Sequence, residues 1–211
     1  KTALLLTIVT LTAIAVYLTV PISLFLTLLG AIVGFVVALI IIFSGSMNPI
    51  LICTYAACQG LFLGGITWII EKQVDAPGLG IVAAVLTLLI LGVMLSIYRA
   101  GLISWNKNMQ IAVTSSMVAI LLIYLVSFIG SFVGFEVPLI HGNGIIGIAF
   151  SVFVVGIASL CLVADFDFIE RGVERGAPKQ LEWRAAFGLL VTLIWLYLEI
   201  LKLLAKLASR R

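Results

Sequence analysis

The chain has 211 residues, of which 64% are hydrophobic and only 10% are charged, and its mean hydropathy is +1.33. Soluble domains carry about 25% charged residues, so this composition excludes a soluble domain and indicates an integral membrane protein. Seven spans of about 20 residues would use most of the chain and leave no room for a soluble catalytic domain. The net charge of +3 comes from 12 basic and 9 acidic residues, which are too scattered for a nucleic-acid surface.

Uninterrupted apolar runs predict seven membrane helices along the chain. These runs are 2–20, 22–43, 49–70, 79–99, 109–133, 145–168 and 184–208. Each is expected to be helical, because backbone polar groups inside a bilayer must be satisfied within the segment. The first run resembles the others and lacks a clear signal-peptide cleavage site, so it is interpreted as a membrane helix. Residues 1–211 are therefore predicted to form one all-α, seven-transmembrane-helix domain in the lipid bilayer.

The distribution of Lys and Arg predicts the orientation of the chain. With seven crossings, the N-terminal side carries Lys1, Arg99, Lys107, Arg171, Arg175, Lys179 and Arg184, and the other side carries Lys72, Lys202, Lys206, Arg210 and Arg211. This excess weakly favours a cytoplasmic N-terminus. If the last segment turned back, its four Lys and Arg residues would join the N-terminal side and the basic excess there would be much larger. The positive-inside rule alone therefore favours a re-entrant last segment. The run from Ala185 to Leu201 has no turn residue after Gly188, however, and favours a full span.

Several predicted spans carry small residues four positions apart, a spacing that lets helix backbones approach closely. The pairs and series are Gly30 and Gly34; Ala56, Gly60 and Gly64; Gly130 and Gly134; and Gly147 with Ser151. We interpret them as close packing in a compact bundle, in preference to a pore lining. In the third span, Gln59 is a polar residue for which an interhelical hydrogen bond is favoured over ion coordination in a pore.

The sequence predicts neither an enzyme nor a bound cofactor. Cys53, Cys58 and Cys161 lie in apolar runs without a Cys-x-x-Cys pair, so they are interpreted as small core residues. The single histidine, His141, excludes a metal site built on histidines, and an exposed loop imidazole is expected. The acidic pair Asp165-x-Asp167 resembles a metal-binding motif, but no soluble domain accompanies it to hold a sugar nucleotide.

Three acids in apolar surroundings are the candidates for function, because each ionised group costs at least about 2.5 kcal/mol at mid-bilayer. They are Asp165, Asp167 and Glu199. Residues two apart on a helix point to roughly opposite faces, and Asp165 lies deeper, so Asp165 is the aspartate expected to face Glu199. Two carboxyls that share little water cannot both ionise at low cost, so the pair is expected to titrate as a unit and to sense pH.

Each of these acids also has a plainer interpretation. Glu199 could form a salt bridge with Lys202, which follows three residues later on the same helix face. Asp167 could be a solvated acid beside Arg171, and this is the favoured interpretation of Asp167 taken by itself. Both alternatives remain open at the level of the sequence.

Six segments together resemble the bacterial branch of the Bax inhibitor family, also called the transmembrane Bax inhibitor motif family. These segments are Gly60 to Ile66, His141 to Gly144, Leu162 to Glu170, Gly176 to Lys179, Glu182-Trp183 and Trp195 to Leu201. With seven spans in the right order, the resemblance covers essentially the whole chain. It is fairly specific, because the acid that ends the sixth span and the Leu-Tyr-Leu-acid of the seventh occur together.

The resemblance implies six helices around a central seventh and a pH-sensitive calcium leak in the bacterial inner membrane. Family members carry two aspartates, at the end of the sixth helix and in the seventh, that share a proton and hold the pore closed. By motif these fall on Asp165 and on Glu199, where a Glu replaces the usual Asp. The resemblance thus implies Asp165 and Glu199 as pH sensor, gate and calcium path, and Asp167 as a secondary cation-attracting acid.

Two departures from the family pattern affect this reading. Related bacterial channels carry a basic cluster between the second and third helices, with an arginine that latches one aspartate, whereas this chain has only the segment from Ser44 to Asn48 there. Glu199 also follows Arg184 by 15 residues, roughly 22 Å of helix, so the two acids could lie at different depths. The alternative function is a non-conducting membrane regulator that binds a membrane protease or a cell-death or stress partner.

Overall fold

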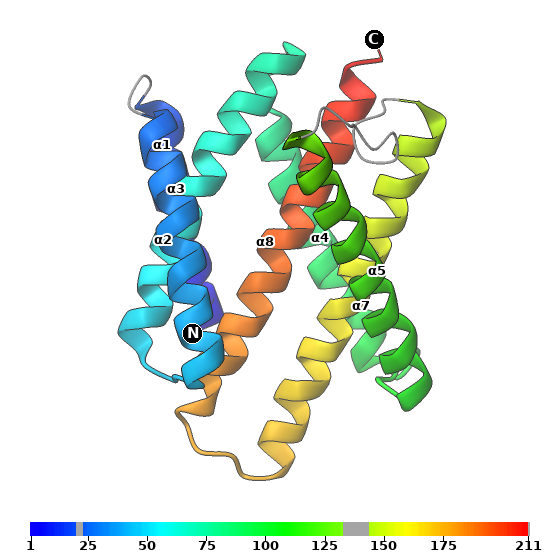
Figure 1. Ribbon diagram of the computed structural model, residues 1–211. Helices are drawn as coiled ribbons and strands as arrows, with labels where there is room; N and C mark the ends of the chain where they lie inside the picture. The colour runs from blue at the N-terminus through cyan, green and yellow to red at the C-terminus, as the bar shows by residue number, and fades with distance from the viewer. Residues whose placement is uncertain (20–22, 133–143, 211) are drawn as a thin grey trace. The chain divides into compact units, whose positions relative to one another are not determined.

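The computed structural model describes residues 1–19, 23–132 and 144–210, and every regular element in these ranges is a helix (Figure 1). The helices are α1 (Thr2–Leu18), α2 (Ser23–Ser44), α3 (Pro49–Val74), α4 (Leu79–Arg99), α5 (Lys107–Phe132), α7 (Ile145–Glu174) and α8 (Leu181–Ala208). The prediction of an all-α membrane protein is confirmed. His141 and the turn around it lie outside the described residues.

Six of these helices are long and apolar enough to cross a membrane. They are α2, α3, α4, α5, α7 and α8, whereas the apolar helix α1 is shorter, at 17 residues. Helix α8 runs without a break for 28 residues, so the last segment has the length of a full span and not the turn that a re-entrant hairpin needs. Half of its apolar window is buried, the largest share among the six. The central place of this helix stays a prediction.

Two helices continue past the apolar runs that predicted them, because a helix ends at a capping residue and not where hydrophobicity ends. Helix α3 reaches Val74 and stops at Asp75, which has a left-handed backbone with φ of 52°. Helix α7 reaches Glu174 and stops before Gly176, at φ of 60°. The Ala177 N–H then donates to the Gly172 carbonyl at 2.9 Å, which closes the last turn of α7.

The chain divides into two compact units, which are described separately. Unit 1 comprises Lys1–Gly80 and Phe168–Ile194, and unit 2 comprises Ile81–Asp167 and Trp195–Arg211. In unit 1, α3 packs against both α1 and α2. In unit 2, α5, α7 and the second half of α8 share a hydrophobic cluster of Val113, Ile120, Val154, Ile157 and Cys161, against which Trp195 and Tyr124 pack.

Glycines on α3 hold the unit 1 helices close together. A Cβ atom added at Gly64 would lie 2.3 Å from the Ala13 carbonyl oxygen, and one at Gly60 would overlap the Thr12 hydroxyl. On α2, a Cβ at Gly30 would lie 2.6 Å from the Cys58 carbonyl oxygen. The prediction that this small-residue spacing serves close packing is confirmed for these positions.

Candidate functional site

The most deeply buried acid among the described residues is Glu199, on the half of α8 that belongs to unit 2. Its relative exposure is 1%, and donors surround its carboxylate. The Tyr124 hydroxyl of α5 lies 2.9 Å from Oε2 and 3.0 Å from Oε1. The Trp195 indole N–H, one turn earlier on α8, donates to Oε1 at 3.0 Å. The contacts of this carboxylate with Tyr124 and Trp195 are thus made with hydrogen-bond donors.

Lys202 supplies the counter-charge to Glu199. Its Nζ lies 2.7 Å from Oε1 of Glu199 and donates to the Tyr124 hydroxyl oxygen at 3.0 Å. The same ammonium lies 4.5 Å from the centroid of the Tyr124 ring, which is a cation–π distance. The structure therefore shows the salt bridge that the spacing of these two residues allowed.

Lys206 forms a second, separate contact one turn further along α8. Its Nζ donates to the Gly147 carbonyl at 3.0 Å and to the Ser151 hydroxyl at 2.9 Å. Both partners are buried on α7, so Gly147 and Ser151 are used for anchoring the end of α8. This explains the small residues at these two positions by contact with a lysine side chain.

The contact between Lys206 and Ser151 fixes the register of α8 against α7 within unit 2. The two helices run in opposite directions, so Glu199, seven residues before Lys206, is level with Ala158, seven residues after Ser151. Asp165 lies seven residues further along α7, roughly 10 Å from that level. Asp165 is only partly exposed and its Oδ2 atom is buried. The two acids thus occupy successive levels of one unit, and a shared proton between them stays a prediction.

The other two sequence candidates lie at less buried positions. Asp167 is partly exposed, and the residue between it and Asp165, Phe166, is buried on α7 against Tyr98 of α4. In unit 1, Gln59 is partly buried, and its Nε2 would lie 3.3 Å from a Cβ added at Gly34 of α2. Gln59 therefore lies at the contact between α3 and α2, and its role in packing or in a pore stays a prediction. The role of Asp167 as a cation-attracting acid stays a prediction.

Sequence reasoning missed a second buried acid, Glu71, which follows the predicted apolar run 49–70 and was left outside it. The residue is 6% exposed near the end of α3 in unit 1. Its Oε2 accepts the Tyr17 hydroxyl of α1 at 2.7 Å, and its Oε1 accepts the N–H of Gly80, in the first turn of α4, at 2.7 Å. The sequence did contain an indication that Glu71 is buried. Gly60, Gly64, Thr67 and Glu71 follow one another at helical spacing on one face of α3, and all four are buried.

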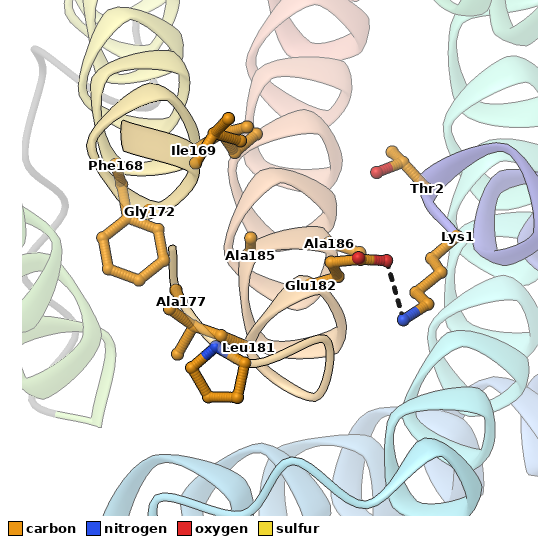
Figure 2. A pocket seen from close by; sticks show the side chains of 12 residues that line it. Lys1, Thr2, Phe168, Ile169, Gly172, Ala177, Leu181, Glu182, Ala185 and Ala186 are labelled. Carbon is orange, nitrogen blue, oxygen red and sulfur yellow. Dashed lines mark ion pairs between the residues drawn. The ribbon is translucent and has the colours of Figure 1, made fainter. Parts of the chain in front are cut away.

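A cavity of about 250 Å³ opens beside the first turn of α8 in unit 1 (Figure 2). Apolar and small residues of α7 and α8 line most of it, including Phe168, Gly172 and Ala185. At one side the Lys1 ammonium pairs with Glu182 at 2.8 Å, where the Glu182 side chain is exposed and the Lys1 side chain is partly exposed. Lys1 also lies 5.1 Å from the centroid of the Trp183 ring. Basic and aromatic side chains of this kind are typical of a membrane–water interface.

The described residues contain no group of three or more His, Cys, Asp or Glu side chains that could hold a metal ion. Cys58 and Cys161 are buried, Cys53 is partly buried, and all three are free thiols, in agreement with their interpretation as core residues.

The fold and the site define an integral membrane protein of apolar helices, with a charged cluster buried in one of its two units. The family model described as Bax inhibitor 1 like matches residues 1–209. The chain therefore belongs to the Bax inhibitor 1 like family, which confirms the resemblance found in the sequence. Comparisons with curated proteins and with solved structures give no significant match.

Proposed function

We propose that this protein is a pH-modulated calcium leak in a bacterial inner membrane, with its N-terminus in the cytoplasm. The observation that carries the proposal is the buried Glu199 carboxylate in a chain of the Bax inhibitor 1 like family. An ionisable group inside a membrane bundle is costly, and such groups usually mark ion or proton pathways. Carboxylate oxygens are also the preferred ligands of a hard cation such as calcium.

Asp165 and Glu199 would act as two acidic stations along the path within unit 2. An ion that passes the level of Asp165 meets Glu199 roughly 10 Å further on, at the level of Ala158. Asp167 would attract cations to this end of the path. Both acids of the family's pair would then have a role, but each acid would bind the ion in turn. Ion conduction is supported by successive sites of this kind, each of which binds the ion weakly enough to release it.

Protonation of these acids would couple the leak to pH. At low pH, a neutral Glu199 and a neutral Asp165 offer no charge to a cation, so the path is closed; at higher pH they ionise and the path opens. Two other titratable groups contact the Glu199 carboxylate directly. Within unit 2 they are the Tyr124 hydroxyl from α5 and the Lys202 ammonium from α8.

The competing proposal, a non-conducting regulator, needs a surface for a protein partner. Faces of small residues on the helices are one kind of surface that would allow such lateral binding. Gly60 and Gly64 are covered by α1 within unit 1, and Gly147 and Ser151 receive the Lys206 ammonium within unit 2. These positions are used inside the protein, which favours the leak over the regulator.

Calcium flux into liposomes that contain the purified protein tests the proposal. Wild type and the double variant Asp165→Asn, Glu199→Gln are compared across roughly pH 5 to 8, which brackets the titration of perturbed carboxyls. Flux that rises with pH in wild type and loses this dependence in the double variant supports the proposal. An unchanged pH dependence in the double variant would overturn the assignment of these acids. Flux no greater than that of empty liposomes at every pH would favour the regulator.

A further inference from the structure

The ammonium group of Lys202 occupies the position at which a soluble cation would meet Glu199. It contacts a carboxylate oxygen at 2.7 Å, a phenol oxygen at 3.0 Å and an aromatic face at 4.5 Å. These are the groups with which proteins bind cations. A calcium ion and the Lys202 ammonium cannot hold this place at the same time, because both need the same oxygens of Glu199 and Tyr124.

The two partners of this ion pair differ in their freedom to move. The Glu199 side chain is 2% exposed, and Trp195 and Tyr124 also hold its carboxylate. The Lys202 side chain is 38% exposed and has a flexible stem of four carbons. The lysine can therefore swing away while the acid stays in place.

We propose that Lys202 is a tethered counter-ion that competes with soluble cations for Glu199 and so keeps the leak slow. The inference rests on the proposed function and adds its regulation. A cation can occupy Glu199 only when the ammonium leaves, and the tether returns the ammonium at a high effective concentration. Replacement of Lys202 by a neutral residue leaves the buried charge of Glu199 without its partner, and calcium from solution can then take that place.

Lys206 provides a matched control, since it lies on the same helix four residues later. It carries the same charge and is also partly buried, but it donates to Gly147 and Ser151 and not to Glu199. A general effect of positive charge on calcium flux would appear in variants at either lysine. An effect through Glu199 would appear only at Lys202.

The test measures calcium flux into liposomes at about pH 8, where proton competition for carboxyls is small. We compare wild type with Lys202→Met, Lys206→Met and the double variant Lys202→Met, Glu199→Gln. The expected result is a rise in flux of about tenfold for Lys202→Met, the effect of removing a close charge partner. Lys206→Met should stay within about twofold of wild type, as expected for a charge outside the contact. The double variant should lose the gain, because no charge remains for the cation to bind.

The double variant also shows whether a gain in flux comes from poor folding and not from the loss of the Lys202 ammonium. It carries no unpaired buried charge, so it should melt close to the wild-type temperature, and flux is compared at equal amounts of folded protein. A gain that persists in the double variant would be a packing defect and would overturn the inference. Unchanged flux in Lys202→Met, or an equal gain in Lys206→Met, would overturn it as well.

The outcomes separate this inference from the proposed function. If wild type leaks calcium and Lys202→Met leaks no more, the inference fails and the leak function stands. If wild type shows no calcium flux and Lys202→Met shows a flux that is lost with Glu199→Gln, the inference stands and the proposed leak function of the wild-type protein fails. If neither protein leaks, both fail.

Discussion

The packing of α1 against α3 predicts a large effect from a single added methyl group at Gly64. In the structure, the new Cβ of Gly64→Ala would lie 2.3 Å from the carbonyl oxygen of Ala13 and 2.9 Å from its Cα atom, whereas ordinary contact begins at 3.4 Å. The obstructing atoms belong to the backbone, so no side-chain rotation relieves the clash. The two helices would have to separate locally by about 1.1 Å, at a cost of about 1–3 kcal/mol.

Thermal unfolding in detergent micelles, followed by circular dichroism, measures this cost. A loss of about 1–3 kcal/mol corresponds to a fall in Tm of about 2–12 °C for a chain of this size. Gly92→Ala is the matched control, because Gly92 is also in a helix and a Cβ there meets no atom within 4 Å. It should leave Tm unchanged or raise it slightly, since alanine favours helix over glycine. Equal Tm values for the two variants would refute the close approach of α1 and α3.

Three other predictions concern the remaining polar groups. Glu71→Met should destabilise the protein by about 1–3 kcal/mol, because methionine removes both oxygens that accept the Tyr17 hydroxyl and the buried Gly80 N–H; a variant as stable as wild type in thermal unfolding would contradict the dual contact. Glu182→Gln should leave Tm unchanged within error, because its ion pair with Lys1 is exposed and screened by solvent; a clear loss would show a structural role. Finally, Asp75→Cys and Ser104→Cys in a cysteine-free background place single thiols at exposed positions on either side of α4. In cells, an impermeant thiol reagent should label the cysteine at position 75 and not the one at position 104, as a cytoplasmic N-terminus requires. The reverse labelling would contradict the proposed orientation.

The spans could be predicted from the sequence because hydrophobicity in a membrane protein is set by the lipid and not by tertiary contacts. The predicted starts at residues 49, 79 and 145 coincide with those of α3, α4 and α7. The end of α7 could not be placed from hydrophobicity, because the charged residues after Phe168 continue the helix beyond the apolar run as far as Glu174. Helix ends depend on local capping, which apolar composition does not report.

The candidate site was only partly predictable. The contact between Glu199 and Lys202 follows from a spacing of three on one helix, so the sequence indicated it. Tyr124 lies 75 residues earlier, within an apolar run, and no local pattern connects it to Glu199. Glu71 was misassigned because a charge near the end of an apolar run usually marks a loop. Its burial depends on partners from α1 and α4, and these become neighbours only in the folded chain.

The central claim is that the Glu199 carboxylate makes the calcium path sensitive to pH. The most direct test is calcium flux into liposomes between roughly pH 5 and 8 for wild type, Glu199→Gln and Glu199→Asp. The claim predicts that Glu199→Gln loses most of the rise in flux with pH and that Glu199→Asp, which keeps the carboxylate, retains it. A Glu199→Gln protein with the pH profile of wild type would contradict the claim.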